Sequence, residues 1–406
     1  MLIPDWALQV GYDGLERGLI PDFVVRLGIR AMLQQRLCEI DHGSLEANHA
    51  AKMAWIEGVK QKTYIADVPD KANEQHYEVS TNFILSTLGP CAKYSACLFP
   101  SGNETLEEAE VLMLESYCEK AQLQDGQDVL DLGCGWGSLS LYLAKKYPNS
   151  RITGLSNSST QKAHIDATAK LHELTNLKII TADINVHDFP VTTRFDRILS
   201  IEMFEHMKNY QVLFKKVSTW LKSSINTESF LFIHVFCHRT TPYHFEDTEG
   251  REGGDKTNWM AKYFFSGGTM PSHDLLLYFQ DDLSLVRSWY LPGTHYSKTL
   301  EAWLKLQDQN GQSGLEELEL DAKSKGQDPI EGLKAFHRFR VFYMASSELF
   351  NFNKGQERHP NREHRVLRLR GLAAVYIFKL KEGMAALHSS SKLVISIMIV
   401  TSVHMQ

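Results

Sequence analysis

The sequence predicts an α/β protein with a doubly wound parallel sheet and with helical N-terminal and cap additions. Three observations predict this fold. Short apolar runs alternate with helix-like stretches over residues 121–240, a glycine-rich turn follows the first of these runs, and apolar residues recur at helical spacing on either side of the region. Strands that alternate with helices in this way form parallel sheets covered on both faces.

Composition sets the broad class of the chain. With 406 residues, of which 43% are hydrophobic and 23% charged, the chain can bury a large core. Its formal net charge of −6 gives no electrostatic support for a nucleic-acid partner or for binding to an anionic membrane surface. We therefore expect no nucleic acid among its partners.

The cysteines and the apolar runs favour a cytoplasmic protein without a metal centre. The sequence has six cysteines but no CxxC pair and no zinc-type grouping with histidine, so we expect reduced thiols. The first ten residues lack the pattern of a secretory signal, and the apolar run at 393–403 is too short to span a bilayer. We expect no stable membrane insertion.

The first part of the chain, residues 1–120, is predicted to be a helical extension that contributes to the substrate and cofactor pocket. Residues 1–60 carry apolar side chains at helical spacing, with a helix start signal at Pro21 and Asp22. Prolines interrupt the following stretch, and another helix is expected over 104–120.

Residues 121–240 are predicted to form the Rossmann-like cofactor-binding core. Strands are expected at 128–132, 151–156, 177–181, 195–201 and 230–235, and helices at 138–147, 159–172 and 210–221.

After residue 240 the pattern changes, and we predict a helical cap and substrate region over 241–356. Within it, the polar stretch 240–268 is expected to be a loop or lid, 282–291 a strand, and 299–307 and 329–350 helices. Residues 357–406 form an atypical C-terminal tail that is basic at first and then rich in serine and apolar residues.

A nucleotide-binding turn follows the first predicted strand. Asp131 is followed by Gly133, Gly135 and Gly137. The glycines let the backbone turn tightly and approach a ligand, and the helix that follows offers free N–H groups. The GxGxG spacing differs from the dinucleotide pattern GxGxxG and is typical of class I methyltransferases that use S-adenosyl-L-methionine. An ordinary tight turn between a strand and a helix is the alternative.

The ends of the next two strands supply further candidates for cofactor binding. The second strand ends without the acid that usually binds ribose hydroxyls, but Asn157 and Gln161 can bind such groups through neutral donors and acceptors. Asp183 follows the third strand, where an aspartate can bind the adenine amino group. A solvated acid at a strand end is the alternative for Asp183.

Several motifs resemble one family of enzymes. They are QHYE at 75–78, KYSAC at 93–97, DLGCGWG at 131–137, GLSNSSTQK at 154–162 and IEMFEHMKNY at 201–210. Over residues 1–356 the chain is similar to the plant coclaurine N-methyltransferases and their pavine and tetrahydroprotoberberine relatives. These enzymes belong to the wider cyclopropane-fatty-acid-synthase group, and the last motif is the most specific of the five.

The resemblance implies roles for residues at matching positions. Together with the glycine turn, it implies a cofactor site made of Ser95, Asp131, Gly133, Gly135, Gly137, Asn157, Gln161, Asp183, Ile184 and Ile201. It implies a catalytic group of Glu78, Glu202, Glu205 and His206. In the cyclopropane synthase branch, the positions of Cys97, Glu205, His234 and Tyr296 hold a bicarbonate base. Whether bicarbonate binds here stays open.

The chemistry of N-methylation favours the same block. It follows the fourth strand, at the edge of the sheet where ligands bind. An amine substrate arrives protonated, so Glu202 and Glu205 can attract it and His206 or Glu205 can accept its proton. Aromatic neighbours can hold the organic cation through cation–π contact: Tyr77, Phe204, Trp259 and Phe264.

Structural roles are the alternatives for these residues. Glu202 and Glu205 are three positions apart and on a helix could form a solvated face, and His206 alone would more often be structural. His234 lies in an apolar strand, where a core histidine is equally expected. Cys97 and Tyr296 taken singly favour structural roles.

The combined prediction is an S-adenosylmethionine-dependent N-methyltransferase that acts on a small tetrahydrobenzylisoquinoline-type amine such as coclaurine. The sequence is also compatible with a homodimer. One alternative is a cyclopropane-synthase-type transfer to an unsaturated lipid, and another is a paralogue inactivated by its altered C-terminus. The last strand that closes the sheet in the family is not recognisable after residue 356, although the run 374–378 could replace it as an edge strand.

Overall fold

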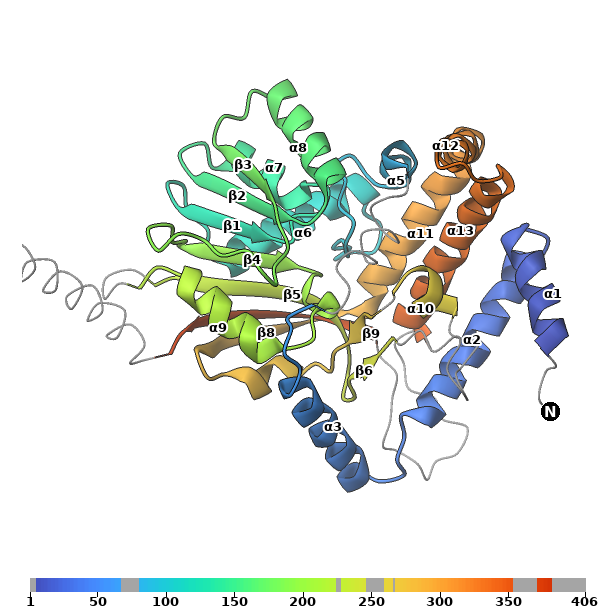
Figure 1. The fold of residues 1–406 in the computed structure, drawn as a ribbon, viewed down its shortest axis with the longest axis horizontal. Helices are drawn as coiled ribbons and strands as arrows, with labels where there is room; N and C mark the ends of the chain where they lie inside the picture. The colour runs from blue at the N-terminus through green and yellow to red at the C-terminus, as the bar shows by residue number, and fades with distance from the viewer. Residues whose placement is uncertain are drawn as a thin grey trace, which may run out of the picture.

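A computed structural model describes residues 5–66, 80–223, 228–245, 259–265, 267–352 and 371–381. A sheet with its covering helices occupies one side of the molecule, and a group of long helices occupies the other (Figure 1). Two predicted site residues, Tyr77 and Glu78, lie outside the described residues.

The N-terminal part is helical, as predicted. Its helices are α1 (Asp5–Glu16), α2 (Asp22–Glu39), α3 (Leu45–Lys60), α5 (Thr81–Thr87) and α6 (Leu106–Lys120). Helix α6 begins at a capping box in which Thr105 accepts from the backbone N–H of Glu108 while the Glu108 side chain accepts from the backbone N–H of Thr105. Such a cap satisfies N–H groups that have no partner within the helix.

A seven-stranded sheet in the order β3-β2-β1-β4-β5-β9-β8 forms the centre of the fold. The strands are β1 (Asp128–Leu132), β2 (Arg151–Ser156), β3 (Leu177–Thr181), β4 (Arg197–Ile201), β5 (Phe230–His238), β8 (Leu283–Pro292) and β9 (Gly371–Leu380). The first five are parallel, and β9 runs antiparallel to both of its neighbours. The predicted Rossmann-like sheet is confirmed.

Helices cover both faces of this sheet. On one face, residues of α3 and α9 (Tyr210–Trp220) pack against β4, β5 and β9. On the other face, α6 and α7 (Ser138–Lys146) pack against the same strands and against β1. Neighbouring residues of β9 alternate between the two cores, as side chains of a strand must. Helix α8 (Ser159–Leu171) lies over β2 and β3.

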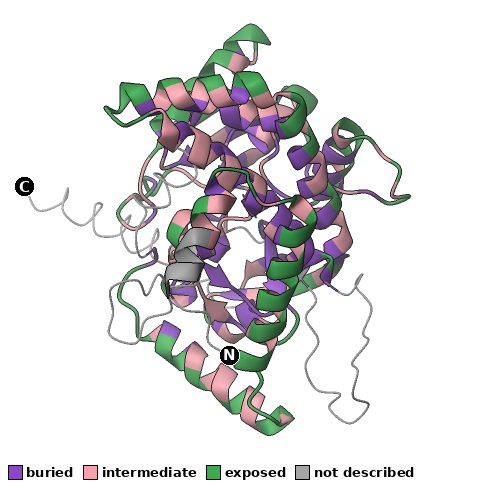
Figure 2. Cartoon of the chain, turned by 90° about the vertical axis from the view of Figure 1, so that its right-hand side faces the viewer, coloured by how far each residue is buried: buried purple, intermediate pink, exposed green. Residues whose placement is uncertain are grey.

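A second core joins the helices of the cap. Helices α11 (Gly293–Gln309), α12 (Gly311–Ser324) and α13 (Ile330–Phe350) pack together and against α2 and α5. Buried residues line their inner sides, whereas exposed residues face outward (Figure 2). Within the part of the chain that the structure describes, no helix is long and apolar enough to cross a membrane.

Helix α12 was not among the predicted helices, and both it and α13 contain glycines within their length. The structure explains their presence by close packing. A Cβ on Gly314 would lie 3.2 Å from Phe83, and one on Gly332 of α13 would lie 2.6 Å from the backbone of Glu319. These glycines therefore let the helices approach one another closely.

The remaining elements are short. They are η1 (Phe204–His206), β6 (Tyr243–His244), α10 (Trp259–Tyr263), β7 (Thr269–Met270) and η2 (Leu275–Phe279). Strand β6 lies inside the stretch predicted to be a loop or lid and pairs with β7, which begins just after that stretch. The rest of that stretch, 246–258 and 266, lies outside the described residues.

Strand β9 corrects one expectation about the tail. The prediction of a strand at 374–378 is confirmed, but its expected position at the edge of the sheet is wrong. The strand lies between β5 and β8 and pairs with both along its length. A continuous apolar run is typical of a strand buried on both faces, and residues 372–378 are all buried. The missing last strand of the family therefore has a replacement.

We predict that Phe378→Ala destabilises the protein by about 3–5 kcal/mol, because it empties a fully buried site against Phe214. Leu320→Ala serves as the control, since Leu320 is 60% exposed, and we expect a change within about 0.5 kcal/mol. Urea denaturation measures both. Equal stability of the two variants would show that β9 does not belong to the core.

Candidate functional site

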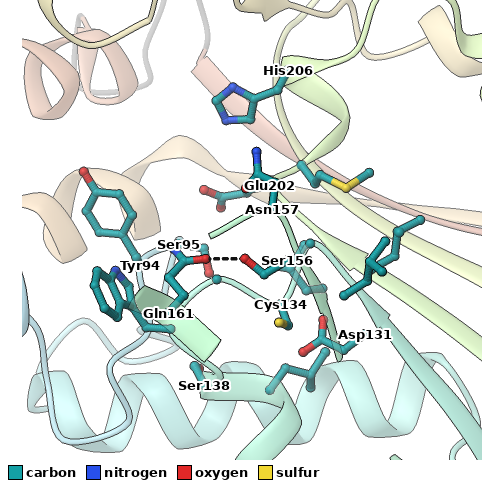
Figure 3. A pocket seen from close by; sticks show the side chains of 18 of the residues that line it. Tyr94, Ser95, Asp131, Cys134, Ser138, Ser156, Asn157, Gln161, Glu202 and His206 are labelled. Carbon is teal, nitrogen blue, oxygen red and sulfur yellow. Dashed lines mark hydrogen bonds between the residues drawn. The ribbon is translucent and has the colours of Figure 1, made fainter. Parts of the chain in front are cut away.

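A cleft opens at the carboxyl ends of β1, β2 and β4, the edge at which ligands of such sheets bind. It encloses about 1280 Å³, its open mouth included. His206 and Glu202 lie toward one end of it, and Asp131 and Ser138 lie toward the other (Figure 3). Of the residues assigned to the cofactor site, nine line the cleft: Ser95, Asp131, Gly133, Gly135, Asn157, Gln161, Asp183, Ile184 and Ile201.

The three glycines after β1 have different roles. All three have positive φ angles, of 83°, 53° and 84° for Gly133, Gly135 and Gly137. A Cβ on Gly133 would lie 2.8 Å from Met203, and one on Gly137 would lie 2.5 Å from Ile165. A Cβ on Gly135 would meet nothing within 4 Å. Gly133 and Gly137 thus allow close packing, whereas Gly135 leaves open space in the cleft, and Gly137 does not line it.

Buried polar groups surround the glycine turn. Asp131 accepts a hydrogen bond of 2.7 Å from Ser140 Oγ, and burial raises the pKa of its carboxyl to about 6. Ser156 donates to Gln161 Oε1 at 2.7 Å (Figure 3). Among the described residues, the buried Gln161 Nε2 has no hydrogen-bond partner. An unsatisfied amide donor in the lining of the same cleft as Gly135 fits a ligand that carries hydroxyl or ring-nitrogen acceptors, as S-adenosyl-L-methionine does.

Glu202 stands at the carboxyl end of β4 in an unusual backbone conformation. Its φ angle is +50°, a region that glycine occupies readily and other residues seldom. Its Oε1 accepts from the N–H of Ala96 at 2.9 Å, and its Oε2 accepts from the hydroxyl of Tyr296 at 2.7 Å. Left-handed backbone at such a residue costs about 1–3 kcal/mol and is typical of functional sites.

Glu205 and His206 follow in η1; Glu205 is fully buried, whereas His206 is half-buried and lines the cleft. Glu205 Oε1 accepts from the N–H of Phe236 at 2.7 Å, while Oε2 has no partner among the described residues. Burial, followed by the charge of Glu202, raises the pKa of Glu205 well above its usual value. Burial, with a contribution from Lys208, lowers the pKa of His206 to about 4. At neutral pH the site therefore combines two acids with a neutral imidazole.

The residues implied to hold bicarbonate lie behind Glu202 and do not line the cleft. His234 Nδ1 lies 2.6 Å from the hydroxyl of Tyr117, and its buried Nε2 has no partner in the described parts of the chain. Cys97 is buried, and burial raises the pKa of its thiol to about 12, so the thiol is neutral. The hydroxyl of Tyr296 is engaged by Glu202. The implied bicarbonate site stays a prediction.

The structure also places aromatic side chains that the sequence analysis misassigned or missed. Phe204 differs from the expectation: it is 1% exposed and packs in the sheet core against Tyr210 and Phe214. The ring of Phe265, which was not predicted, instead lies 5.0 Å from that of His206.

More aromatic rings continue from Phe265 toward Glu202. Phe236 lies 5.5 Å from Phe265, and Phe350 stacks on Tyr296 at 4.3 Å. None of these three phenylalanines was predicted. The position of Phe236, two residues after His234 on the same strand, is the one signal that could have identified it. The predicted Trp259 and Phe264 pack on each other at 5.3 Å in the cap core.

The sheet order and the glycine turn, together with acids at the carboxyl ends of the strands, define a class I S-adenosylmethionine-dependent methyltransferase. Similarity to known proteins supports the assignment to this class of enzymes. Residues 66–320 match the family described as Mycolic acid cyclopropane synthetase, and the chain belongs to this family.

Within the family, plant alkaloid enzymes are similar over most of the chain. The (S)-coclaurine N-methyltransferase of Thalictrum flavum subsp. glaucum is 39% identical over 84% of this chain and 91% of its own length. The Papaver somniferum enzyme of the same name is 37% identical, over 84% and 93%. The cyclopropane-fatty-acyl-phospholipid synthase of Escherichia coli K12 is 30% identical over 62% of this chain and 56% of its own length. The resemblance inferred from the motifs is confirmed.

Solved structures agree with this assignment. A crystal structure of coclaurine N-methyltransferase bound to N-methylheliamine and SAH matches with a TM-score of 0.81 and 35% identity, and covers 92% of this chain and 99% of its own. The cyclopropane synthase MmaA2 from Mycobacterium tuberculosis matches with a TM-score of 0.58 and 21% identity, over 77% and 98%, which supports the fold alone.

We predict that Gly135→Ala weakens binding of S-adenosylhomocysteine at least about tenfold, because the new methyl group enters the open space of the cleft. The matched control is Gly126→Ala. Gly126 also has a positive φ, of 88°, and open space around it, but it does not line the cleft. Isothermal titration calorimetry measures both affinities, and equal losses in the two variants would contradict the assignment of Gly135.

Proposed function

We propose that the protein transfers a methyl group from S-adenosyl-L-methionine to the nitrogen of a small tetrahydrobenzylisoquinoline-type amine such as coclaurine. The observation that carries this proposal is the pair of acids after β4, the half-buried Glu202 on the cleft and the buried Glu205 next to it, together with the neutral His206 on the cleft. Buried acids of this kind suit a cationic ligand that brings the missing positive charge.

The roles of the three residues follow from their charges. A secondary or tertiary aliphatic amine is protonated at neutral pH and cannot attack as a nucleophile. Glu202 lines the cleft and stabilises the bound cation directly, and Glu205 supports the site from its buried position next to the cleft. His206 lines the cleft and is uncharged, so it does not repel the cation and can accept its proton. When bound, S-adenosyl-L-methionine supplies the electrophilic methyl group.

Aromatic side chains support an organic cation as the substrate. Phe265 lies beside His206, which lines the cleft, and Phe236, Phe350 and Tyr296 continue this series of ring contacts. Ring faces attract cations, and flat apolar rings of a substrate can stack on them. The relative whose title names N-methylheliamine as its ligand supports the same substrate class.

Two alternatives remain as outcomes of the test. Transfer to an unsaturated lipid is less favoured, because buried carboxylates near the acceptor do not suit a neutral alkene. Inactivation by the altered C-terminus was considered because the family's last strand is not recognisable in the sequence. It is less favoured because β9 supplies a strand between β5 and β8.

The direct test is incubation of the purified protein with labelled S-adenosylmethionine. Benzylisoquinoline amines and unsaturated phospholipid vesicles serve as separate acceptors. We expect label in the amine and none in the lipid. Label only in the lipid would support the cyclopropane-synthase alternative, and label in neither, from a folded protein that binds S-adenosylhomocysteine, would support the inactive paralogue.

We predict that His206→Asn lowers kcat at least about 100-fold with little change in KM for the amine, because it removes the proton acceptor and leaves both carboxylates. The pKa of His206 is about 4, so it is neutral above that pH and contributes no acid limb between pH 6 and 9. His172→Asn, at an exposed histidine after α8, is the control. An unchanged kcat in His206→Asn would exclude this role.

The cellular location and the oligomeric state are also proposals. The free cysteines are consistent with a cytoplasmic location. A homodimer is also proposed, and analytical ultracentrifugation would measure it.

A further inference from the structure

Lys93 is a buried cation that the roles above do not use. It is 2% exposed, and in the described part of the chain no carboxylate lies within 4 Å of its ammonium group. Its Nζ donates to Ser95 Oγ at 2.6 Å, to the carbonyl of Ala96 at 2.6 Å and to the hydroxyl of Tyr117 at 3.3 Å. Burial lowers the pKa of Lys93, and the nearby Glu202 and Glu110 raise it. Three acceptors match the three protons of an ammonium group, so the hydrogen bonds favour the charged form.

The contacts of Lys93 lead directly to Glu202. The carbonyl of Ala96 accepts from Lys93, and the N–H of the same residue donates to Glu202 Oε1 at 2.9 Å. Lys93 thus holds the residue that orients one oxygen of the carboxylate. Tyr296 holds the other oxygen from α11.

The segment that carries Lys93 is fixed from its other side by Glu110 of α6. The carboxylate of Glu110 accepts from the backbone N–H of Cys91 at 2.9 Å and from that of Lys93 at 3.3 Å. A Cβ on Gly89 would lie within 2.6 Å of this carboxylate. The backbone of the segment is therefore held by Glu110, whereas the positive charge inside it comes from Lys93.

We propose that Lys93 is a positioning residue for Glu202: it fixes Ala96, which orients the carboxylate, and its charge stabilises the anionic form that binds the substrate ammonium. The proposal deepens the function proposed above and rests on it. In this role Lys93 does not contact the reacting atoms. It acts on Glu202 through Ala96 and through its electric field.

The electrostatics of the site agree with this role. Burial raises the pKa of Glu202, and Lys93 is the strongest influence that lowers it, ahead of the hydrogen bonds from Ala96 and Tyr296. Six other titratable residues lie near Glu202, on the strands, helices and loops that surround it. They are Cys97, Tyr117, Glu205, His206, His234 and Tyr296. Cys97, Tyr117 and Tyr296 have raised pKa values and His206 and His234 have lowered ones, so all five are neutral near pH 7. Lys93 is then the one cation in that set.

Amine binding is expected to depend on pH through the ionisation of Glu202. Glu202 must be ionised to hold the cationic amine, so amine binding is present above the pKa of Glu202 and is lost as the pH falls through it. Because Lys93 lowers that pKa, its replacement by a neutral residue moves the loss of binding to higher pH.

The test uses Lys93→Gln and Lys93→Met, with Lys93→Arg as the variant that keeps the charge and Glu110→Gln as the variant that loosens the segment but keeps Lys93. Carbon-13 NMR of glutamate-labelled protein with S-adenosylhomocysteine follows the titration of Glu202, which is assigned by its loss in Glu202→Gln. Amine affinity against pH is measured on the same samples by calorimetry.

We expect the Glu202 titration to move up by about one pH unit in the neutral variants and to stay in place in Lys93→Arg and Glu110→Gln. At a pH below the shifted midpoint, amine affinity should fall about tenfold. The glutamine variant, which keeps hydrogen-bonding groups, carries the test if the methionine variant does not fold.

An unmoved titration in Lys93→Gln, or an equal shift in Glu110→Gln, would overturn the proposal, because either result makes Lys93 merely structural. The NMR titration needs no amine. If the titration shifts as expected but the wild-type protein binds no amine, the proposed substrate class fails while the effect of Lys93 on Glu202 stands.

Discussion

The withdrawal of two carboxyl groups from water after β4, with Glu205 buried and Glu202 half-buried, is the constraint on which the rest of the site depends. Removing a charge from water is costly, and the charge of Glu202 raises the pKa of Glu205 beyond the effect of burial. Glu202 is compensated by two hydrogen bonds and by the field of Lys93, whereas one oxygen of Glu205 keeps no partner among the described residues. One oxygen of Glu205 is therefore left for a further hydrogen-bond donor.

The fold maintains this arrangement through contacts from distant parts of the chain. Strand β5 supports the acids from the sheet, because the N–H of Glu202 donates to the carbonyl of His234 and Glu205 accepts from Phe236. The opposite edge of β5 pairs with β9, which completes the hydrogen bonding of that strand. The cap contributes Tyr296 from α11. Sheet, tail strand and cap thus converge on the same two side chains.

The parts of this structure that depend on local sequence could be predicted. The glycine turn follows from the spacing of Gly133, Gly135 and Gly137, and the parallel strands follow from alternating apolar runs. The position of β9 could not be predicted, since it depends on pairing with β5 and β8, far away in the sequence. Helix α12 was missed because only the tertiary contact of Gly314 with Phe83 explains that glycine.

The orientation of the residues after β4 shows the same limit. The spacing rules for helices and strands do not apply there. The backbone of Glu202 is in the left-handed region, and residues 204–206 form a 3₁₀ turn. That backbone places Glu202 and His206 on the cleft and Phe204 in the core. Lys93 stood within a recognised motif, but its role becomes visible only when its contacts with Ala96 are known.

The most direct test of the central claim compares a tetrahydroisoquinoline amine with its neutral lactam of the same shape. Both are titrated into the complex of the protein with S-adenosylhomocysteine near neutral pH. If the buried carboxylates recognise a cation, the amine should bind at least about thirtyfold more tightly than the lactam. Equal affinities would contradict the account, because shape and apolar contact would then explain binding without the charges of Glu202 and Glu205.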